Sequence, residues 1–151
     1  MKNALIAAVL GTSMLLANGA VLAQAKPETL VKQRQAAMTL QGKYFGPMGG
    51  MAQGKVPYNA DTIKRNTAYL EALASMPWDG FQANTKDTPS KALPAAFTNA
   101  AKFKEAQDRF TGEVGKLAVA VKGGDEAAIK GQIGAVGKSC GGCHESFREK
   151  S

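Results

Sequence analysis

The sequence predicts an all-α protein that folds as an antiparallel four-helix bundle. Apolar residues recur with a period near 3.6 in four separate segments, which is the spacing of one face of a helix. Alanine is abundant, and runs of β-branched residues, which would indicate strands, are absent. Short turns separate the segments except for one long connection over residues 77–94, which fits a crossover in a bundle.

The first 25 residues are organised like a secretory signal peptide. Lys2 gives a positive start, the following residues carry no charge, and the small residues Ala23 and Ala25 flank a cleavage position. A membrane anchor is the alternative, but the segment contains Gly, Asn, Ser and Thr and only a short apolar stretch. We predict that residues 1–25 are a cleaved signal peptide and that residues 26–151 form one domain in a bacterial periplasm.

The charge of the chain narrows the class of partner. The formal net charge is +7, or +6 without Lys2, and the basic residues are spread along the sequence rather than clustered. We therefore expect no nucleic-acid partner, and no membrane partner because no segment after the leader is apolar enough to span a bilayer. We interpret the basic residues as a solvated surface, with attraction for acidic partners as the alternative.

The first helix is expected from Pro27 to about Gly54. Proline suits a first helical turn, and the acidic residue after it favours the positive end of the helix dipole. The Gly46-Pro47 pair is expected to kink this helix or to end its first part. One stripe of the helix is predicted to face inward: Leu30, Val31, Arg34, Ala37, Met38, Gln41, Phe45 and Met48.

The second helix is expected to begin after an N-cap at Asn59 or Asp61 and to run to Ser75, where Pro77 follows. Its inward residues are Ile63, Leu70 and Leu73. The third helix is expected over residues 95–122, with the spacing of a bundle seam at Phe103, Phe110, Val114, Leu117 and Val121.

The fourth helix is expected to begin after Asp125 as N-cap and to reach about Lys150. The Gly123-Gly124 pair separates it from the third helix. Its predicted inward stripe consists of Ile129, Ile133, Val136, Cys140, Cys143, His144 and Phe147.

The two cysteines of the chain and its only histidine form one motif, Cys-x-x-Cys-His, at Cys140, Cys143 and His144. This motif is a signature of covalent c-type haem attachment. On a helix the three side chains share one face, so two thiols can add to the porphyrin vinyl groups while the imidazole reaches the iron. We predict one haem c near the C-terminus, covalently attached through Cys140 and Cys143, with His144 as the axial iron ligand.

Three alternatives use the same residues. A structural disulfide is compatible with an oxidising compartment. A thioredoxin-like redox site also contains Cys-x-x-Cys but needs a βαβ context, for which the sequence gives no signal. A zinc site would need a fourth ligand, and no further cysteine or histidine is present.

The position of the motif and several other stretches resemble cytochrome c′, the high-spin class II c-type cytochromes. The similar stretches are "KPETLVKQRQAAM", "PYNAD", "LASMPWDGF" and the "FR" that follows the haem motif, and the resemblance covers essentially residues 26–151. It implies a left-twisted four-helix bundle, usually an antiparallel homodimer. It also implies a pentacoordinate haem that binds nitric oxide and carbon monoxide and carries an electron, with a redox protein as a further partner.

The sixth coordination position of the iron is the main open question. With a single histidine, bis-histidine ligation is excluded, and Met38 is the candidate on the inward stripe of the first helix. In the resembling family a bulky apolar residue at this point stands over the distal haem face without binding iron. In related low-spin class II cytochromes, which act only as electron carriers, a methionine there is the sixth ligand. Core packing without haem contact is the third interpretation.

Arg34 lies one turn before Met38 on the same stripe and needs a partner if it is buried. The haem propionates offer carboxylates for bidentate pairing, and the alternative is that Arg34 extends to solvent. The resemblance implies that Arg34 and Gln35 contact the haem, which favours the high-spin branch. It also places a basic residue, Arg148, near the proximal imidazole. The alternative is that Arg148 only interacts with the negative end of the helix dipole, which by itself would explain a cation at a helix C-terminus.

The expected activity is binding rather than catalysis. A peroxidase or nitric oxide reductase would need a distal acid–base group or a second metal, and the stripe beside Met38 offers neither. Three aromatic residues either line the haem edge or only pack in the core: Trp78, Phe81 and Phe103.

Overall fold

The structure is a computed structural model that describes residues 25–150. The predicted signal peptide therefore lies, except for its last residue, outside the described residues and stays a prediction. Five α-helices and two short 3-10 helices are present in this range: α1 (Pro27–Ala52), α2 (Ala60–Leu73), η1 (Trp78–Gly80), η2 (Ala83–Thr85), α3 (Ala95–Thr98), α4 (Ala100–Gly123) and α5 (Glu126–Phe147). None of the helices in residues 25–150 has the length and hydropathy of a membrane span.

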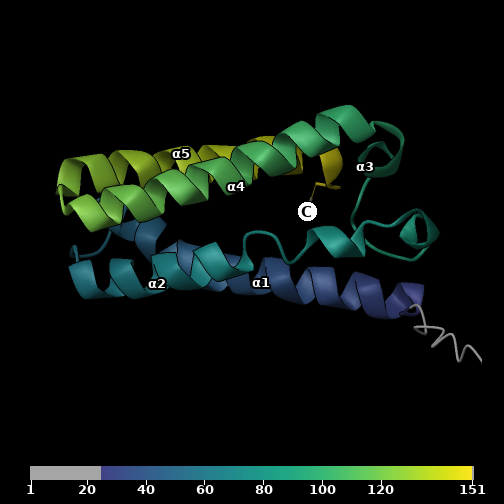
Figure 1. Cartoon of the computed structure of the whole chain (residues 1–151), viewed down its shortest axis with the longest axis horizontal. Coiled ribbons are helices and arrows are strands. Elements are labelled where there is room, and N and C mark those ends of the chain that lie inside the picture. Colours follow the sequence, from purple (N-terminus) through teal and green to yellow (C-terminus); the bar gives the residue numbers. More distant parts are fainter. Residues whose placement is uncertain (1–24, 151) are drawn as a thin grey trace, which may run out of the picture.

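The four long helices form the predicted bundle. Helix α1 packs against α2 and α5, and α4 packs against α2 and α5, so that each long helix has two neighbours. Figure 1 shows α1 and α2 side by side in one layer and α4 and α5 in the other, with the crossover and α3 at one end. Short connections join α1 to α2 and α4 to α5, which makes both pairs antiparallel.

The core of the bundle lies between these layers. Its buried apolar residues come from all four long helices and the end of α2, mostly at the positions that the 3.6-residue period predicts. They are Met48, Met51, Ile63, Leu70, Ala74, Phe110, Val114, Leu117, Ile129, Ile133 and Val136. A second, smaller cluster lies beside the crossover and consists of Ala96, Phe103 and Phe147.

Helix α1 does not end at Gly46-Pro47 but continues to Ala52. Proline inside a helix removes one hydrogen bond and crowds the preceding turn. Beyond it, however, Met48 and Met51 are both buried in the core. Packing of these two side chains stabilises the last turn of the helix despite the proline.

The predicted third helix is divided in two, which corrects the expectation of one helix over residues 95–122. Helix α3 ends at Thr98, and Asn99 takes a non-helical conformation with φ −114° and ψ 61°. The Asn99 side chain accepts a hydrogen bond from the Lys102 backbone N–H at 3.4 Å and caps α4. Asparagine favours this position because its side chain satisfies an N–H that the helix leaves free.

Helix α5 ends at Phe147 rather than at the predicted Lys150. The Asp125 cap is confirmed, since its carboxylate accepts from the Ala128 N–H at 2.6 Å. After Phe147 the backbone is extended, and the Phe147 carbonyl accepts from the Leu93 N–H at 2.9 Å. Pairing with the end of the crossover therefore replaces the last helical turn.

Candidate haem-binding site

Two adjoining cavities lie where α1, the crossover and the C-terminal half of α5 meet. The larger has a volume of about 460 Å³ and the smaller about 240 Å³. Both are within or close to the range of pockets that hold small molecules and cofactors. The same five residues line both cavities and mark where they meet: Met38, Gly42, Trp78, Cys143 and His144.

The three residues of the haem motif lie on the cavity side of α5, as predicted. Cys140 lines the smaller cavity, and Cys143 and His144 line both. Both cysteines are half-buried and free rather than joined in a disulfide. Within residues 25–150, no three acidic, cysteine or histidine side chains are grouped to hold a metal ion.

Burial favours the neutral forms of these three side chains. It raises the pKa of the Cys140 thiol to about 11, with a further contribution from Cys143 close by, and it also raises the pKa of Cys143. Desolvation, and secondarily the charge of Arg148, lower the pKa of His144, although the residue is exposed. Neutral imidazole is the form of histidine that coordinates a metal.

Arg34 is buried, with only 3% of its surface exposed, so the alternative that it extends to solvent does not hold. Its Nη1 donates hydrogen bonds to the Gly80 carbonyl at 2.6 Å and to the Thr85 Oγ1 at 3.2 Å. Its Nη2 donates to the Ser90 Oγ at 2.8 Å, and its Cζ lies 4.4 Å from the centre of the Phe81 ring. Arg34 thus holds the crossover against α1.

The partners of Arg34 are all uncharged, and none of the ion pairs among the described residues includes it. A guanidinium has five N–H groups, so two are not used in these three hydrogen bonds. The charged side chains that line that cavity besides His144 are all basic, namely Arg34, Lys91 and Arg148. This lining suits an apolar group that carries carboxylates, as haem does with its propionates.

The other predicted residues also reach the cavities. Met38 is half-buried on α1, on the wall opposite α5, whereas Gln35 is exposed and lines only the larger cavity. Trp78, Phe81 and Phe103 line the larger cavity, and the Trp78 ring meets the Phe103 ring edge-on at 6.4 Å. The aromatic residues therefore form an apolar wall as well as part of the core.

Among the lining residues that the sequence analysis missed are Gly42, Ser90, Lys91 and Ala92. Gly42 is one turn after Met38, so its helical spacing could have identified it. The other three belong to the crossover, whose irregular backbone has no periodicity from which their position could be inferred.

The residues present therefore fit haem c. Two thiols and an imidazole lie on one wall, and apolar and aromatic side chains form the others. Gly42, which lines both cavities, adds no side chain to the wall that α1 forms. Three basic side chains can pair with the two propionates.

Comparison with known proteins agrees with this fit. Residues 29–148 match the cytochrome C′ family. The cytochrome c′ of Rubrivivax gelatinosus is 41% identical over 126 residues, covering 83% of this chain and 98% of the relative. The solved cytochrome c prime of Shewanella frigidimarina has a TM-score of 0.80 at 32% identity, covering 84% of this chain and 99% of that chain.

A nitric oxide complex of a variant of the cytochrome c prime from Alcaligenes xylosoxidans is also similar. It has a TM-score of 0.77 at 39% identity, and the match covers 83% of this chain and 98% of that chain. Fold, sequence and attachment motif thus agree over nearly the whole described chain. We conclude that the chain belongs to the cytochrome c′ family and carries haem c bound covalently through Cys140 and Cys143.

Proposed function

We propose that this cytochrome is periplasmic, holds its haem with His144 as the only protein ligand to iron, and binds nitric oxide and carbon monoxide. The haem iron, when bound, supplies the affinity for these gases and the capacity to carry one electron. The side chains of the protein hold the haem and determine which ligands reach its distal side. We propose no enzymatic activity.

The observation that carries the proposal is the composition of the smaller cavity. It has two polar side chains that are neither cysteine nor histidine, Gln41 and Ser139. Gln41 Nε2 donates to the Leu73 carbonyl at 2.8 Å, and Ser139 Oγ donates to the Val136 carbonyl at 2.7 Å. Water and anions lose solvation free energy on entering such surroundings and gain few hydrogen bonds in return. Neutral diatomic molecules lose little solvation free energy there. The nitric oxide complex of the Alcaligenes xylosoxidans protein supports this choice of ligand.

The residues around the haem have distinct proposed roles. Arg34, with Lys91 and Arg148 beside it, pairs with the propionates, and Gln35 adds a polar contact at the entrance of the larger cavity. Met38 packs against the distal side and keeps water out without binding iron. Arg148 lies near His144, where its positive charge disfavours protonation of the imidazole.

The test is the absorption spectrum of the purified ferric and ferrous protein, with and without nitric oxide and carbon monoxide. An open sixth position gives a high-spin ferrous spectrum that changes on adding either gas. Met38→Leu then leaves the spectrum without added gas unchanged. A low-spin ferrous spectrum that becomes high-spin in Met38→Leu would instead identify Met38 as the sixth ligand and the protein as an electron carrier only.

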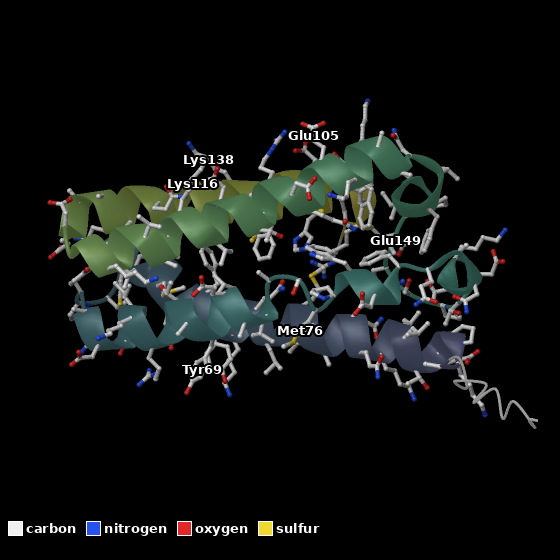
Figure 2. The ribbon with its side chains drawn as sticks, in the orientation of Figure 1. Tyr69, Met76, Glu105, Lys116, Lys138 and Glu149 are labelled. Carbon is white, nitrogen blue, oxygen red and sulfur yellow. The ribbon has the colours of Figure 1, made fainter. Side chains whose placement is uncertain are left out.

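A homodimer formed through α1 and α2 is part of the proposal. Four of the exposed large apolar residues belong to these helices or to the segments that follow them: Leu40, Val56, Tyr69 and Met76. Figure 2 shows Tyr69 and Met76 on the outer side of this layer, away from α4 and α5. Light scattering should give twice the chain mass, and a charge introduced at Tyr69 should give the monomer.

A further inference from the structure

Gly42 occupies an unusual position in the site. It is in the middle of α1, where glycine destabilises a helix relative to alanine. Packing does not require glycine here, because an added Cβ would meet no atom within 4 Å apart from the adjacent residues and the backbone of its own helix. Other helical glycines, such as Gly112 in α4, are equally free, so freedom alone does not explain Gly42. What distinguishes Gly42 is that it lines both cavities of the haem site.

The space over Gly42 is not filled by its neighbours on α1. Side chains of a helix lean toward its N-terminus, so this space would be covered by the residues three and four positions later. The residue four positions later is Gly46, which has no side chain. The residue three positions later, Phe45, directs its ring toward α5, where its Cζ lies 3.3 Å from the position of a Cβ at Gly137.

The same region is accessible from outside. Gly42 is exposed, although it lines the two cavities, and Met38 one turn earlier is half-buried. The bare backbone at Gly42 thus lies at a point where the surface, the larger cavity and the smaller apolar cavity meet.

We propose that Gly42 is a specificity-determining residue, whose missing side chain keeps open the passage by which a small neutral gas enters the smaller cavity. The inference rests on the proposed gas binding and adds a control point to it. Met38 determines what fits over the distal side of the haem, whereas Gly42 determines how fast a ligand arrives. A side chain at residue 42 would project into the passage and narrow it in proportion to its volume.

The experiment measures association of carbon monoxide with the haem-loaded ferrous protein by stopped flow. Gly42→Ala and Gly42→Leu are compared with Gly112→Ala and Gly112→Leu, which change an equally free helical glycine that lines none of the three described cavities. Both alanine variants should raise the melting temperature by about 3 °C, because alanine favours a helix. Only the residue 42 variants should slow association, by about tenfold for leucine and less for alanine.

Three results would overturn the inference. If wild type binds carbon monoxide and Gly42→Leu associates as fast as Gly112→Leu, the gas enters elsewhere, while the proposed function stands. If Gly42→Leu changes only the release rate, residue 42 acts on the bound ligand and not on entry. If the wild-type ferrous protein binds no carbon monoxide, the proposed function fails and this inference fails with it. Gly42→Ala provides the comparison if the leucine variant does not load haem.

Discussion

At the scale of single residues, Arg34 connects sequence and function most directly. The sequence identified it as a cation on an apolar stripe, which needs a partner when buried. The structure gives it three oxygen partners from the crossover and a cation–π contact with Phe81. Because these partners lie 46 to 56 residues away in sequence, one side chain fixes a long connection that forms a wall of the haem site.

The closest of these contacts depends on a glycine, which gives a first prediction. A Cβ at Gly80 would lie 2.6 Å from Arg34 Cβ and 2.7 Å from the backbone oxygen of Leu30. Gly80→Ala should therefore lower the free energy of unfolding by about 1–3 kcal/mol, because a backbone atom cannot give way. Urea denaturation of the haem-loaded protein measures this change. Gly112→Ala is the control and should be stabilising, and equal midpoints for the two variants would contradict the predicted clash.

At the scale of elements, helix ends are determined by short-range hydrogen bonds. Asn59, Asn99 and Asp125 each cap the helix that follows, and each accepts from a backbone N–H three residues later. The Asp125 cap was predicted, and Asn59 was one of two predicted positions, with Asp61 as the other, since these residues precede clear apolar periods. The Asn99 cap was missed because the apolar spacing continues across it and suggests one uninterrupted helix.

The Asp125 cap gives a second prediction. Its carboxylate lies 2.6 Å from the Ala128 nitrogen and also favours the positive end of the α5 dipole. Asp125→Ala should lower the free energy of unfolding by about 1 kcal/mol. Thermal unfolding measures the loss, with Asp87→Ala, a change at an exposed loop position, as the control. A loss no larger than that of the control would show that the cap contributes nothing.

A third prediction concerns pH and the contact between α4 and α5. Hydrogen bonds from Lys116 and then Gln132 lower the pKa of Glu113 from its ordinary 4.5. A carboxyl with a lowered folded-state pKa contributes stability above 4.5, and this contribution is lost as pH falls through the lowered value. Wild type should therefore be more stable than Glu113→Gln at pH 7, and the difference should disappear in acid. Urea midpoints at several pH values test this, and a constant difference would contradict it.

At the scale of the whole molecule, the bundle leaves two adjoining cavities at the end that carries the cysteines. Protein interiors are normally close-packed, so cavities of this size indicate that a group attached there completes the packing of the folded protein. The end of the chain is fixed as well, because the Glu149 N–H donates to the Lys91 carbonyl at 2.9 Å. Figure 2 shows Glu149 between the two layers, beside the crossover.

The covalent attachment gives the fourth prediction. The purified protein should have the mass of its polypeptide plus one haem, with a polypeptide of residues 26–151 if the signal peptide is cleaved as predicted, and acid denaturation should not release the haem. Cys140→Ser with Cys143→Ser should abolish this added mass and lower the melting temperature, because the cavities lose their covalent filling. Either single variant should keep the haem through one thioether. Mass spectrometry decides, and haem mass retained in the double variant would contradict the attachment.

By itself the sequence determined the fold class, the cofactor and its two thioether positions. These depend on local spacing, namely a period of 3.6 residues and the i, i+3, i+4 positions of Cys140, Cys143 and His144. It also indicated that Arg34 needs a partner, but not which one. The partner groups of the crossover, the wall formed by residues 90–92 and the end of α5 at Phe147 were decided only by the tertiary structure. The physical reason is that these contacts join segments far apart in sequence, through irregular backbone that carries no periodic signal.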